Sequence, residues 1–335
     1  MDFLKDIVKE IGDDYTKLAS DISDSQSCID TGSLVFNGLV SGSIFGGVAS
    51  NKITAIAGES STGKTFFALA VAKNFLDNNP DAYVLYFDTE SSITRALLDS
   101  RNIDTKRFVV INVVTIEEFR SKALRAVDIY LKTNIEDRKP CMFVLDSLGM
   151  LSTEKEITDA LNDKQVRDMT KSQLVKGAFR MLTLKLGQAN IPLIVTNHTY
   201  DVIGSYVPTK EMGGGSGLKY AASTIIYLTK KKEKSEKEVV GNIIKAKTAK
   251  SRLSKENQEV NIRLYYDERG LDKYYGLLEL GEIAGLWKNV AGRYQINGKK
   301  IYGKEILRNP TEYFTDDIME QLDGIAKSVF SYGTN

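Results

Sequence analysis

The sequence predicts an α/β fold with a mostly parallel central sheet covered by helices. Short apolar segments that suit buried strands alternate with longer segments of helical periodicity. Strands that are apolar on both faces and separated by helices are typical of parallel sheets buried between two helical layers. A glycine-rich motif over residues 58–65 follows the first of these strands, and it indicates which edge of the sheet carries the function.

The expected elements follow from this pattern in chain order. Apolar residues at steps of three and four predict an amphipathic helix over residues 3–22, whose apolar face can pack on its own domain or on a second subunit. Strands are expected at 53–57, 83–87, 108–113, 142–145, 193–196 and 224–228. Helices are expected between them at 65–76, 116–131 and 173–186.

The later part of the chain has a different pattern. Segments 242–246 and 260–266 alternate in polarity on either side of a basic loop, which predicts an antiparallel hairpin at the edge of the sheet. From about Gly270 the segments become shorter, with small helices and a glycine-containing hairpin over 289–302. Residues 270–335 are therefore expected to form a small α+β C-terminal domain.

The composition is that of an ordinary globular protein. Of 335 residues, 42% are hydrophobic and 27% charged, and the net charge of +1 requires any contact with nucleic acid to be local. One histidine, His198, excludes a histidine-rich metal site. Cys28 and Cys141 make no disulfide framework, which indicates a reducing compartment such as the cytoplasm. No apolar run approaches the ~20 residues that span a bilayer, and no signal peptide is evident.

The glycine-rich motif predicts a nucleotide site. It fits G-x-x-x-x-G-K-[ST] between an apolar strand and a helix, which is the context of a phosphate-binding loop. Its backbone N–H groups and the helix N-terminus would face the phosphates, with the lysine on the β- and γ-phosphates and the last hydroxyl on Mg²⁺. The residues of the motif are Gly58, Glu59, Ser60, Ser61, Thr62, Gly63, Lys64 and Thr65.

Three further side chains end neighbouring strands. Asp146 ends the run CMFVLD; its position at the C-terminal end of a buried strand favours a Mg²⁺ carboxylate, with a helix N-cap as the alternative. Glu90 follows the strand at 83–87 and is the candidate general base, with a solvated loop acid as the alternative. His198 ends the strand in PLIVTNHT; it suits a γ-phosphate sensor, with a core histidine as the alternative.

Several short blocks in the same order resemble the RecA/UvsX family of recombinases, and especially its phage UvsX branch. Besides the phosphate loop, they are DSLGML at 146–151, EKE at 154–156, DALN at 159–162, DMT at 168–170, IP at 191–192, NHTY at 197–200, MGGGSG at 212–217, KSR at 250–252 and GLLEL at 276–280. The resemblance covers residues 30–290.

The resemblance implies an organisation and an activity. Residues 1–30 would be an N-terminal polymerisation segment, 31–269 a RecA-like P-loop ATPase core with DNA-binding loops, and 270–335 the small domain. The protein would hydrolyse ATP with Mg²⁺, form helical filaments on single-stranded DNA and pair that DNA with a homologous duplex. A single-strand-binding protein and a loader are further expected partners, and a phage-encoded chain would act in the host cytoplasm.

The resemblance also implies two DNA-binding loops, at about 152–170 and 199–217. The second loop is glycine-rich, so that its backbone can approach phosphates. The first loop carries acids as well as bases, and its charge alone suits a solvated helix face. The implied DNA-binding residues are Lys155, Lys164, Arg167, Tyr200, Tyr206, Lys210, Gly213, Gly214 and Gly215.

Lys250 and Arg252 resemble the two cations that reach the ATP of an adjacent subunit. Lys245 and Lys247 are rivals for this role, because the whole stretch 230–255 is basic, and part of it could gather duplex DNA.

The sequence departs from the family at Leu97, where relatives place an aromatic residue that stacks on adenine. Adenine packing would then be weaker, or would use Arg95 or another apolar surface.

Two other functions remain open. A hexameric DnaB-type helicase or a KaiC-like ring ATPase uses the same core, but helicases carry an N-terminal domain larger than the 30 or so residues that precede the core here. The second alternative is a DNA-coating mediator that binds ATP without catalysis. The presence of Lys64, Glu90 and Asp146 favours hydrolysis.

Overall fold

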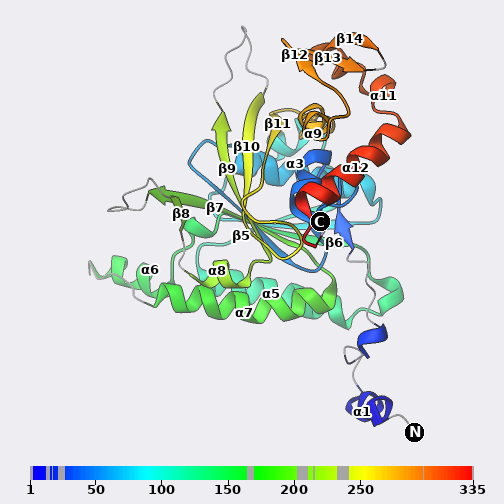
Figure 1. Ribbon diagram of the computed structural model, residues 1–335. Helices are drawn as coiled ribbons and strands as arrows, with labels where there is room; N and C mark the ends of the chain where they lie inside the picture. Colours follow the sequence, from blue (N-terminus) through cyan, green and yellow to red (C-terminus); the bar gives the residue numbers. More distant parts are fainter. Residues whose placement is uncertain are drawn as a thin grey trace.

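The computed structural model describes residues 3–12, 16, 18–21, 27–163, 170–201, 210–213, 216–231, 241–296 and 298–333. Its centre is one mixed sheet (Figure 1) with the strand order β11-β10-β9-β3-β7-β6-β4-β5. The predicted mostly parallel sheet is therefore confirmed. The parallel strands are β3 (Ile53–Gly58), β4 (Tyr83–Asp88), β5 (Phe108–Asn112), β6 (Cys141–Asp146), β7 (Leu193–Asp201) and β9 (Thr224–Lys231).

The antiparallel edge was also predicted correctly. β10 (Gly241–Ser251) pairs with β9 on one side and with β11 (Glu259–Tyr265) on the other, both antiparallel. A short strand that the sequence did not predict, β8 (Lys210–Met212), pairs with the far end of β7. Strand β7 thus continues to Asp201, well beyond its apolar segment.

Helices cover both faces of the sheet, as Figure 1 shows. Side chains alternate along each strand, so Ile56 and Val144 enter one core while Ala55 and Leu145 enter the other. The first core is covered by α2 (Leu34–Ser41), α3 (Lys64–Asn78), α4 (Arg95–Asp99), α9 (Leu277–Ile283) and α12 (Asp316–Phe330). The second is covered by α5 (Ile116–Lys132), α7 (Lys171–Ala189) and α8 (Ser216–Ala221).

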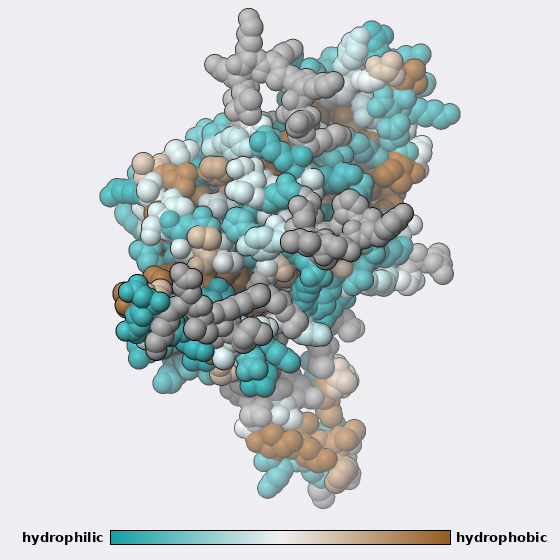
Figure 2. All heavy atoms as spheres, turned by 90° about the vertical axis from the view of Figure 1, so that its left-hand side faces the viewer, coloured by the Kyte–Doolittle hydropathy of each residue, from teal (hydrophilic) through white to brown (hydrophobic). Residues whose placement is uncertain are grey.

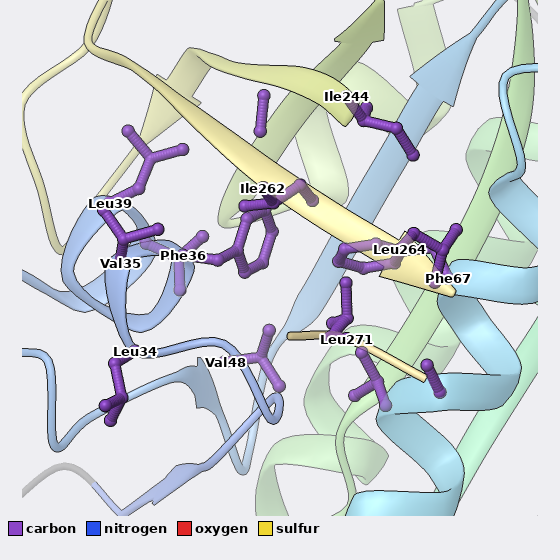
Figure 3. Packing of buried hydrophobic residues seen from close by; sticks show 14 of the residues in the cluster. Leu34, Val35, Phe36, Leu39, Val48, Phe67, Ile244, Ile262, Leu264 and Leu271 are labelled. Atoms are coloured by element: carbon purple, nitrogen blue, oxygen red, sulfur yellow. The ribbon is translucent and has the colours of Figure 1, made fainter. Parts of the chain in front are cut away.

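The edge strands pack on α2 and α3 in the first core. Figure 3 shows Ile262 and Leu264 of β11 packed in the same cluster as Phe36 of α2 and Phe67 of α3. The two phenylalanine rings meet edge to face, with centroids 5.0 Å apart. This contact joins α2 to α3, the helix that begins at the phosphate loop.

The C-terminal part contains the predicted small antiparallel sheet. It consists of β12 (Asn289–Val290), β13 (Arg293–Ile296) and β14 (Lys299–Tyr302), followed by α10 (Gly303–Ile306) and α11 (Pro310–Tyr313). Helix α12 returns to α2, and Phe330 fits against Gly38, where a Cβ would lie 3.4 Å from its ring. The last helix therefore shares the first core with the nucleotide-binding part of the chain.

The N-terminal segment differs from its prediction. Helix α1 (Phe3–Ile11) ends at Ile11 and does not extend to residue 22, because Gly12 adopts a left-handed conformation with φ 65°. A short 3₁₀ turn, Ala19–Asp21, follows, and β1 (Cys28–Ile29) pairs with β2 (Val48–Ala49). No residue of α1 is buried. Figure 1 shows this helix away from the sheet, and Figure 2 shows apolar surface on that projecting part.

Candidate nucleotide and DNA site

The carboxyl ends of four parallel strands bring the predicted site residues together. Strand pairing places Gly58 of β3 opposite His198 of β7, and Asp88 of β4 opposite Asp146 of β6. The phosphate loop follows Gly58, and Glu90 follows Asp88 by two residues. Residues from four distant segments therefore share one edge, as expected where ligands bind to open α/β sheets.

The phosphate loop is held by close backbone contacts. Gly58 has no room for a side chain, because a Cβ would lie 2.7 Å from Leu228 O. Gly63 has φ 90° and leads into α3. Inside the loop Lys64 Nζ donates to Gly58 O at 3.0 Å and to Glu59 O at 2.8 Å. The ammonium thus lies within the curve of the loop that would surround a phosphate.

Burial shapes the electrostatics of this lysine. Loss of water lowers the pKa of Lys64, while the nearby carboxylates of Asp146 and Glu90 raise it. Thr62 Oγ1 donates to Glu59 O at 2.9 Å, Ser60 and Ser61 are exposed, and Thr65 is half-buried in the first turn of α3.

Asp146 lies near Lys64 and accepts hydrogen bonds from two hydroxyl groups. Tyr86 OH donates to Asp146 Oδ2 at 2.7 Å, and Thr196 Oγ1 donates to Asp146 Oδ1. Burial raises the pKa of Tyr86, and the adjacent Asp146 carboxylate raises it further, so the phenol remains a donor. Thr65 and Asp146 offer the hydroxyl and carboxylate oxygens that suit Mg²⁺.

The loop that carries Glu90 is tied to the end of β6. Asp88 accepts from Glu90 N and from Ile93 N, both at 3.0 Å, which turns the chain after β4. Thr89 N donates to Asp146 O at 2.9 Å, and Thr89 Oγ1 accepts from Ser147 N at 2.8 Å. These bonds fix the backbone of Glu90 relative to the aspartate that would hold the metal.

The Glu90 side chain points toward two polar neighbours. Ser147 Oγ donates to Glu90 Oε1 at 3.2 Å, and His198 Nε2 lies 3.8 Å from the same oxygen. The structure thus brings together Lys64, Glu90, Asp146 and His198. Their separation in the sequence explains why only the register of the strands could show this arrangement.

His198 also adjoins the start of the second predicted DNA loop. Asn197 is fully buried and its Nδ2 donates to Gly213 O at 2.8 Å, while Gly213 N donates to His198 O at 3.0 Å. Gly149 packs against the same group, since a Cβ there would lie 3.0 Å from Asn197 Oδ1. The histidine strand and Gly213, the first residue of the glycine run, are therefore joined by hydrogen bonds.

The predicted DNA-binding residues are placed only in part. Lys155 is exposed on α6 (Glu154–Leu161), which begins with a capping box between Thr153 and Glu156. Tyr200 is exposed on β7, and β8 begins at Lys210. The other predicted contacts, which lie outside the described residues, are Lys164, Arg167, Tyr206, Gly214 and Gly215.

The cations predicted to act in trans lie at the far end of β10. Lys250 Nζ donates to Lys219 O at 2.6 Å and to Tyr220 O at 3.3 Å, and burial lowers its pKa, as does nearby Arg252. The Arg252 side chain is exposed. Of the rivals, Lys245 pairs with Glu259 at 2.8 Å and Lys247 is exposed. Arg252 is thus presented to solvent, whereas Lys250 is bound to the end of α8.

Sequence reasoning missed several groups that organise the site. Tyr86 and Thr196 lie inside apolar strand segments, Asp88 is the last residue of β4, and Thr89 and Ser147 directly follow strands. Their only signal was a polar residue within or just after a buried strand. Leu97, the predicted adenine position, is half-buried on α4. Its backbone N–H donates a hydrogen bond to Oγ1 of Thr94, the N-cap of this helix, at 3.2 Å.

A phosphate loop between β3 and α3, with acids at the ends of β4 and β6, defines a P-loop nucleotide-binding protein of the α/β class. Residues 2–272 match the RecA N-terminal domain, and the chain therefore belongs to the RecA family. The resemblance predicted from the sequence is confirmed, and membership in this family implies ATP binding and DNA binding.

Named relatives agree with this assignment. The chain is 35% identical over 246 residues to the recombination and repair protein of Enterobacteria phage T4. The aligned region covers 73% of this chain and 61% of the phage protein, so this chain spans less than two thirds of that relative's length. It is 26% identical to Protein RecA of Thermus aquaticus over 98% of this chain and 95% of that protein.

Among the described residues, no helix is long and apolar enough to cross a membrane.

Proposed function

We propose that the protein is an ATP-dependent DNA recombinase that forms filaments on single-stranded DNA and catalyses homologous pairing and strand exchange in recombination and repair. The observation that carries this proposal is the convergence of Lys64, Glu90, Asp146 and His198 at one sheet edge. The His198 strand is in turn hydrogen-bonded to Gly213 of the second loop. A nucleotide contact and a DNA contact would thus share one element.

The site residues support ATP hydrolysis. The loop residues would hold the β- and γ-phosphates, with Lys64 moving from its carbonyl contacts to the phosphate oxygens. A bound Mg²⁺ would neutralise the developing phosphate charge, with Thr65 and Asp146 holding it. Glu90 would orient the attacking water and accept its proton. Ser147 and His198 lie next to the Glu90 carboxylate and would set its direction.

The same contacts support coupling between DNA and the nucleotide. His198 lies beside Glu90, and its backbone carbonyl accepts from Gly213 at the glycine run. A shift of His198 on γ-phosphate binding would therefore move Gly213 in the loop that would hold DNA. Conversely, DNA on this loop would favour one position of His198 and change hydrolysis.

Self-association is supported by apolar surfaces that the single chain leaves uncovered. Helix α1 exposes Phe3, Leu4 and Ile11, although a helix of this pattern normally buries one face. Strand β5 is an edge of the central sheet and exposes Val109. We infer that α1 of one copy packs on the core of the next, which repeats along a filament because the contact is head-to-tail.

Filament formation would also complete the ATP site. Arg252 is exposed, so it can reach the phosphates of an adjacent copy and act only in the assembly.

Duplex DNA has a separate candidate surface on β10, where Lys245 and Lys247 point to the same face. A cavity of about 440 Å³ beside Lys245 includes Lys230, and a duplex would bind there through phosphate contacts.

The decisive assay is strand exchange between a circular single strand and a homologous linear duplex. We expect joint molecules only with ATP and Mg²⁺, and electron micrographs of the same mixture should show helical filaments. Closed rings would instead favour a DnaB-type or KaiC-like ATPase. Coated DNA without joint molecules would favour a mediator.

The phage relative supports action in a host cytoplasm, with a single-strand-binding protein and a loader as partners.

A further inference from the structure

Two buried hydroxyl groups approach the candidate metal carboxylate, Asp146, from the strands on either side of it. Strand β6 lies between β4 and β7, and these two strands supply the donors. Tyr86 OH donates to Asp146 Oδ2 at 2.7 Å, and Thr196 Oγ1 donates to Asp146 Oδ1. Both donor residues are 0% exposed, and Asp146 is 4% exposed. Within the described part of the chain, these are the only hydrogen bonds to the carboxylate.

Both donors are held in place by their own surroundings. The Tyr86 ring belongs to the first core and packs on Phe108 of β5, with centroids 5.5 Å apart. Thr196 pairs with Ile56 of β3, and because it is β-branched its side chain has few rotamers. The Asp146 carboxylate cannot turn or shift without breaking a buried hydrogen bond, which costs free energy. The fold therefore sets the position of its two oxygens.

Burial explains why Asp146 needs hydrogen-bond donors, but not why the donors are hydroxyl groups. A directly bonded cation would hold a buried carboxylate more strongly, but it would also cancel the negative charge. Lys64 is the nearby cation, and its printed contacts are with loop carbonyls rather than with Asp146. Hydroxyl groups fix the carboxylate and leave its charge in place. Each ionised oxygen also keeps a lone pair beyond the one that accepts the hydrogen bond, so it can still bind a metal.

The rigidity of an oxygen ligand bears on which cation it suits. Mg²⁺ requires a near-ideal octahedron of oxygens at about 2.0–2.1 Å, whereas Ca²⁺ accepts roughly six to eight oxygens at about 2.3–2.6 Å in flexible arrangements. Selectivity between the two ions depends on the size, number and flexibility of the ligands. A carboxylate that cannot shift is unable to adjust to the larger ion. Groups that hydrogen-bond to a metal ligand commonly change metal affinity by about 10- to 100-fold.

We propose that Tyr86 and Thr196 are positioning residues for the nucleotide-bound metal, and that by fixing Asp146 they make the site select Mg²⁺ over Ca²⁺. The inference rests on the proposed binding of ATP with Mg²⁺ at Thr65 and Asp146. Both hydroxyl groups act through the carboxylate to which they donate. Their role is thus distinct from that of the metal ligands themselves.

The test separates the contribution of the metal from the affinity of the nucleotide alone. A fluorescent, non-hydrolysable ATP analogue would be titrated into the full chain without DNA, with EDTA, with saturating Mg²⁺ and with saturating Ca²⁺. The ratio of the affinities with and without an ion is the gain that this ion provides. For the parent we expect a larger gain from Mg²⁺ than from Ca²⁺.

Tyr86→Phe and Thr196→Val each remove one hydroxyl group and keep the size of the side chain. In both variants the gain from Mg²⁺ should fall roughly tenfold. The gain from Ca²⁺ should stay close to that of the parent, because a more mobile carboxylate still suits the larger ion. Affinity with EDTA should match the parent. Thr196→Ser retains a hydroxyl group and should keep the preference for Mg²⁺.

Two matched controls remove hydroxyl groups that do not contact Asp146. Tyr130 of α5 donates to Lys139 O at 2.9 Å, and Thr248 of β10, which is fully buried, donates to Lys255 O at 3.1 Å. Tyr130→Phe and Thr248→Val should show the gains of the parent from both ions. The melting temperature of every variant, recorded with EDTA, shows whether it is folded.

Two results would overturn this inference while the proposed function stands. One is a gain from Mg²⁺ that is unchanged in both Tyr86→Phe and Thr196→Val. The other is an equal loss of affinity with and without an ion, because a purely structural role weakens nucleotide binding in either case. A parent that gains nothing from Mg²⁺, or binds no analogue, would contradict the proposed ATP site and this inference together. Since no DNA is present, failure of strand exchange would not affect these measurements.

Discussion

Hydroxyl groups within apolar strands determine how the acidic side chains of the site are oriented. Tyr86 and Thr196 approach Asp146 from β4 and β7, and Ser147 approaches Glu90 from the end of β6. Each acid is therefore held in one direction before any ligand binds. Preorganised groups of this kind lower the cost of orienting charge during a reaction.

The role of Glu90 is tested by Glu90→Gln, which keeps the size and the hydrogen bond with Ser147 but cannot accept a proton. We expect ATP and single-stranded DNA to bind as in the parent, while turnover falls by about 10²-fold. Steady-state hydrolysis and nucleotide binding measure the two effects. Loss of nucleotide binding in this variant would mean that Glu90 holds the ligand and is not the base.

Residue-level prediction from the sequence succeeded where residues act as a contiguous motif. Residues 58–65 connect β3 to α3 as their spacing indicates, and Asp146 ends β6. Glu90 lies two residues beyond the end of β4, whereas His198 lies within β7, which continues to Asp201. Tyr86, Thr196 and Asn197 were not predicted as part of the site. Their contacts depend on strand register between β4, β6 and β7, which a single sequence does not specify.

At the level of elements, β7 connects the two halves of the site. Its apolar first part lies in the sheet between β3 and β6, and its polar end pairs with β8. The sequence predicted only residues 193–196 of this strand, because strand prediction follows apolar residues. The extension to Asp201 results from pairing with β8 across a long loop, and that is a tertiary effect.

His198→Ala tests this connection. We expect ATP hydrolysis without DNA to remain within a few-fold of the parent, because Lys64, Glu90 and Asp146 are intact. Stimulation by single-stranded DNA should be lost, since the side chain between Glu90 and the second loop is missing. Hydrolysis rates with and without DNA provide the comparison. Equal stimulation in mutant and parent would exclude His198 as the connection.

Helix α1 is the element that the sequence predicted least accurately. Apolar spacing continues past Gly12, so periodicity alone extended the helix to residue 22, whereas the left-handed backbone at Gly12 ends it. The helix nevertheless has the exposed apolar side chains that assembly requires.

The double variant Phe3→Ser, Ile7→Ser should assemble poorly on DNA but unfold at the parent temperature, because neither side chain is buried. Light scattering and thermal unfolding measure the two properties. Ile283→Ser, at an exposed apolar position of α9, is the control and should assemble normally. Normal assembly of the double variant would remove α1 from the interface.

At the level of the whole molecule, the proposal requires two copies for one complete ATP site. The sequence supplied the family resemblance and the parallel sheet with its antiparallel edge, because these depend on patterns that span many residues. Contacts between copies depend on surfaces, and in sequence such surfaces look like ordinary solvated segments. Arg252 is a clear example, since it lies in a stretch rich in lysine and arginine.

Mixing variants tests action in trans. Lys64→Ala and Arg252→Ala should each be nearly inactive alone in hydrolysis with DNA. Their mixture should recover part of the activity, because some interfaces then combine an intact Lys64 from one copy with an intact Arg252 from the next. Arg293→Ala, at an exposed arginine of β13, should remain active without mixing. A mixture as inactive as its components would place Arg252 outside the neighbouring site.

The central claim is that one sheet edge joins the ATP site to a DNA-binding loop and is completed by a second copy. The most direct measurement is the ATP hydrolysis rate of the purified chain with increasing single-stranded DNA, recorded together with its assembly state. We predict that hydrolysis rises with DNA and that the active species is a filament. A chain that remains monomeric, with the same rate at every DNA concentration, would contradict the claim.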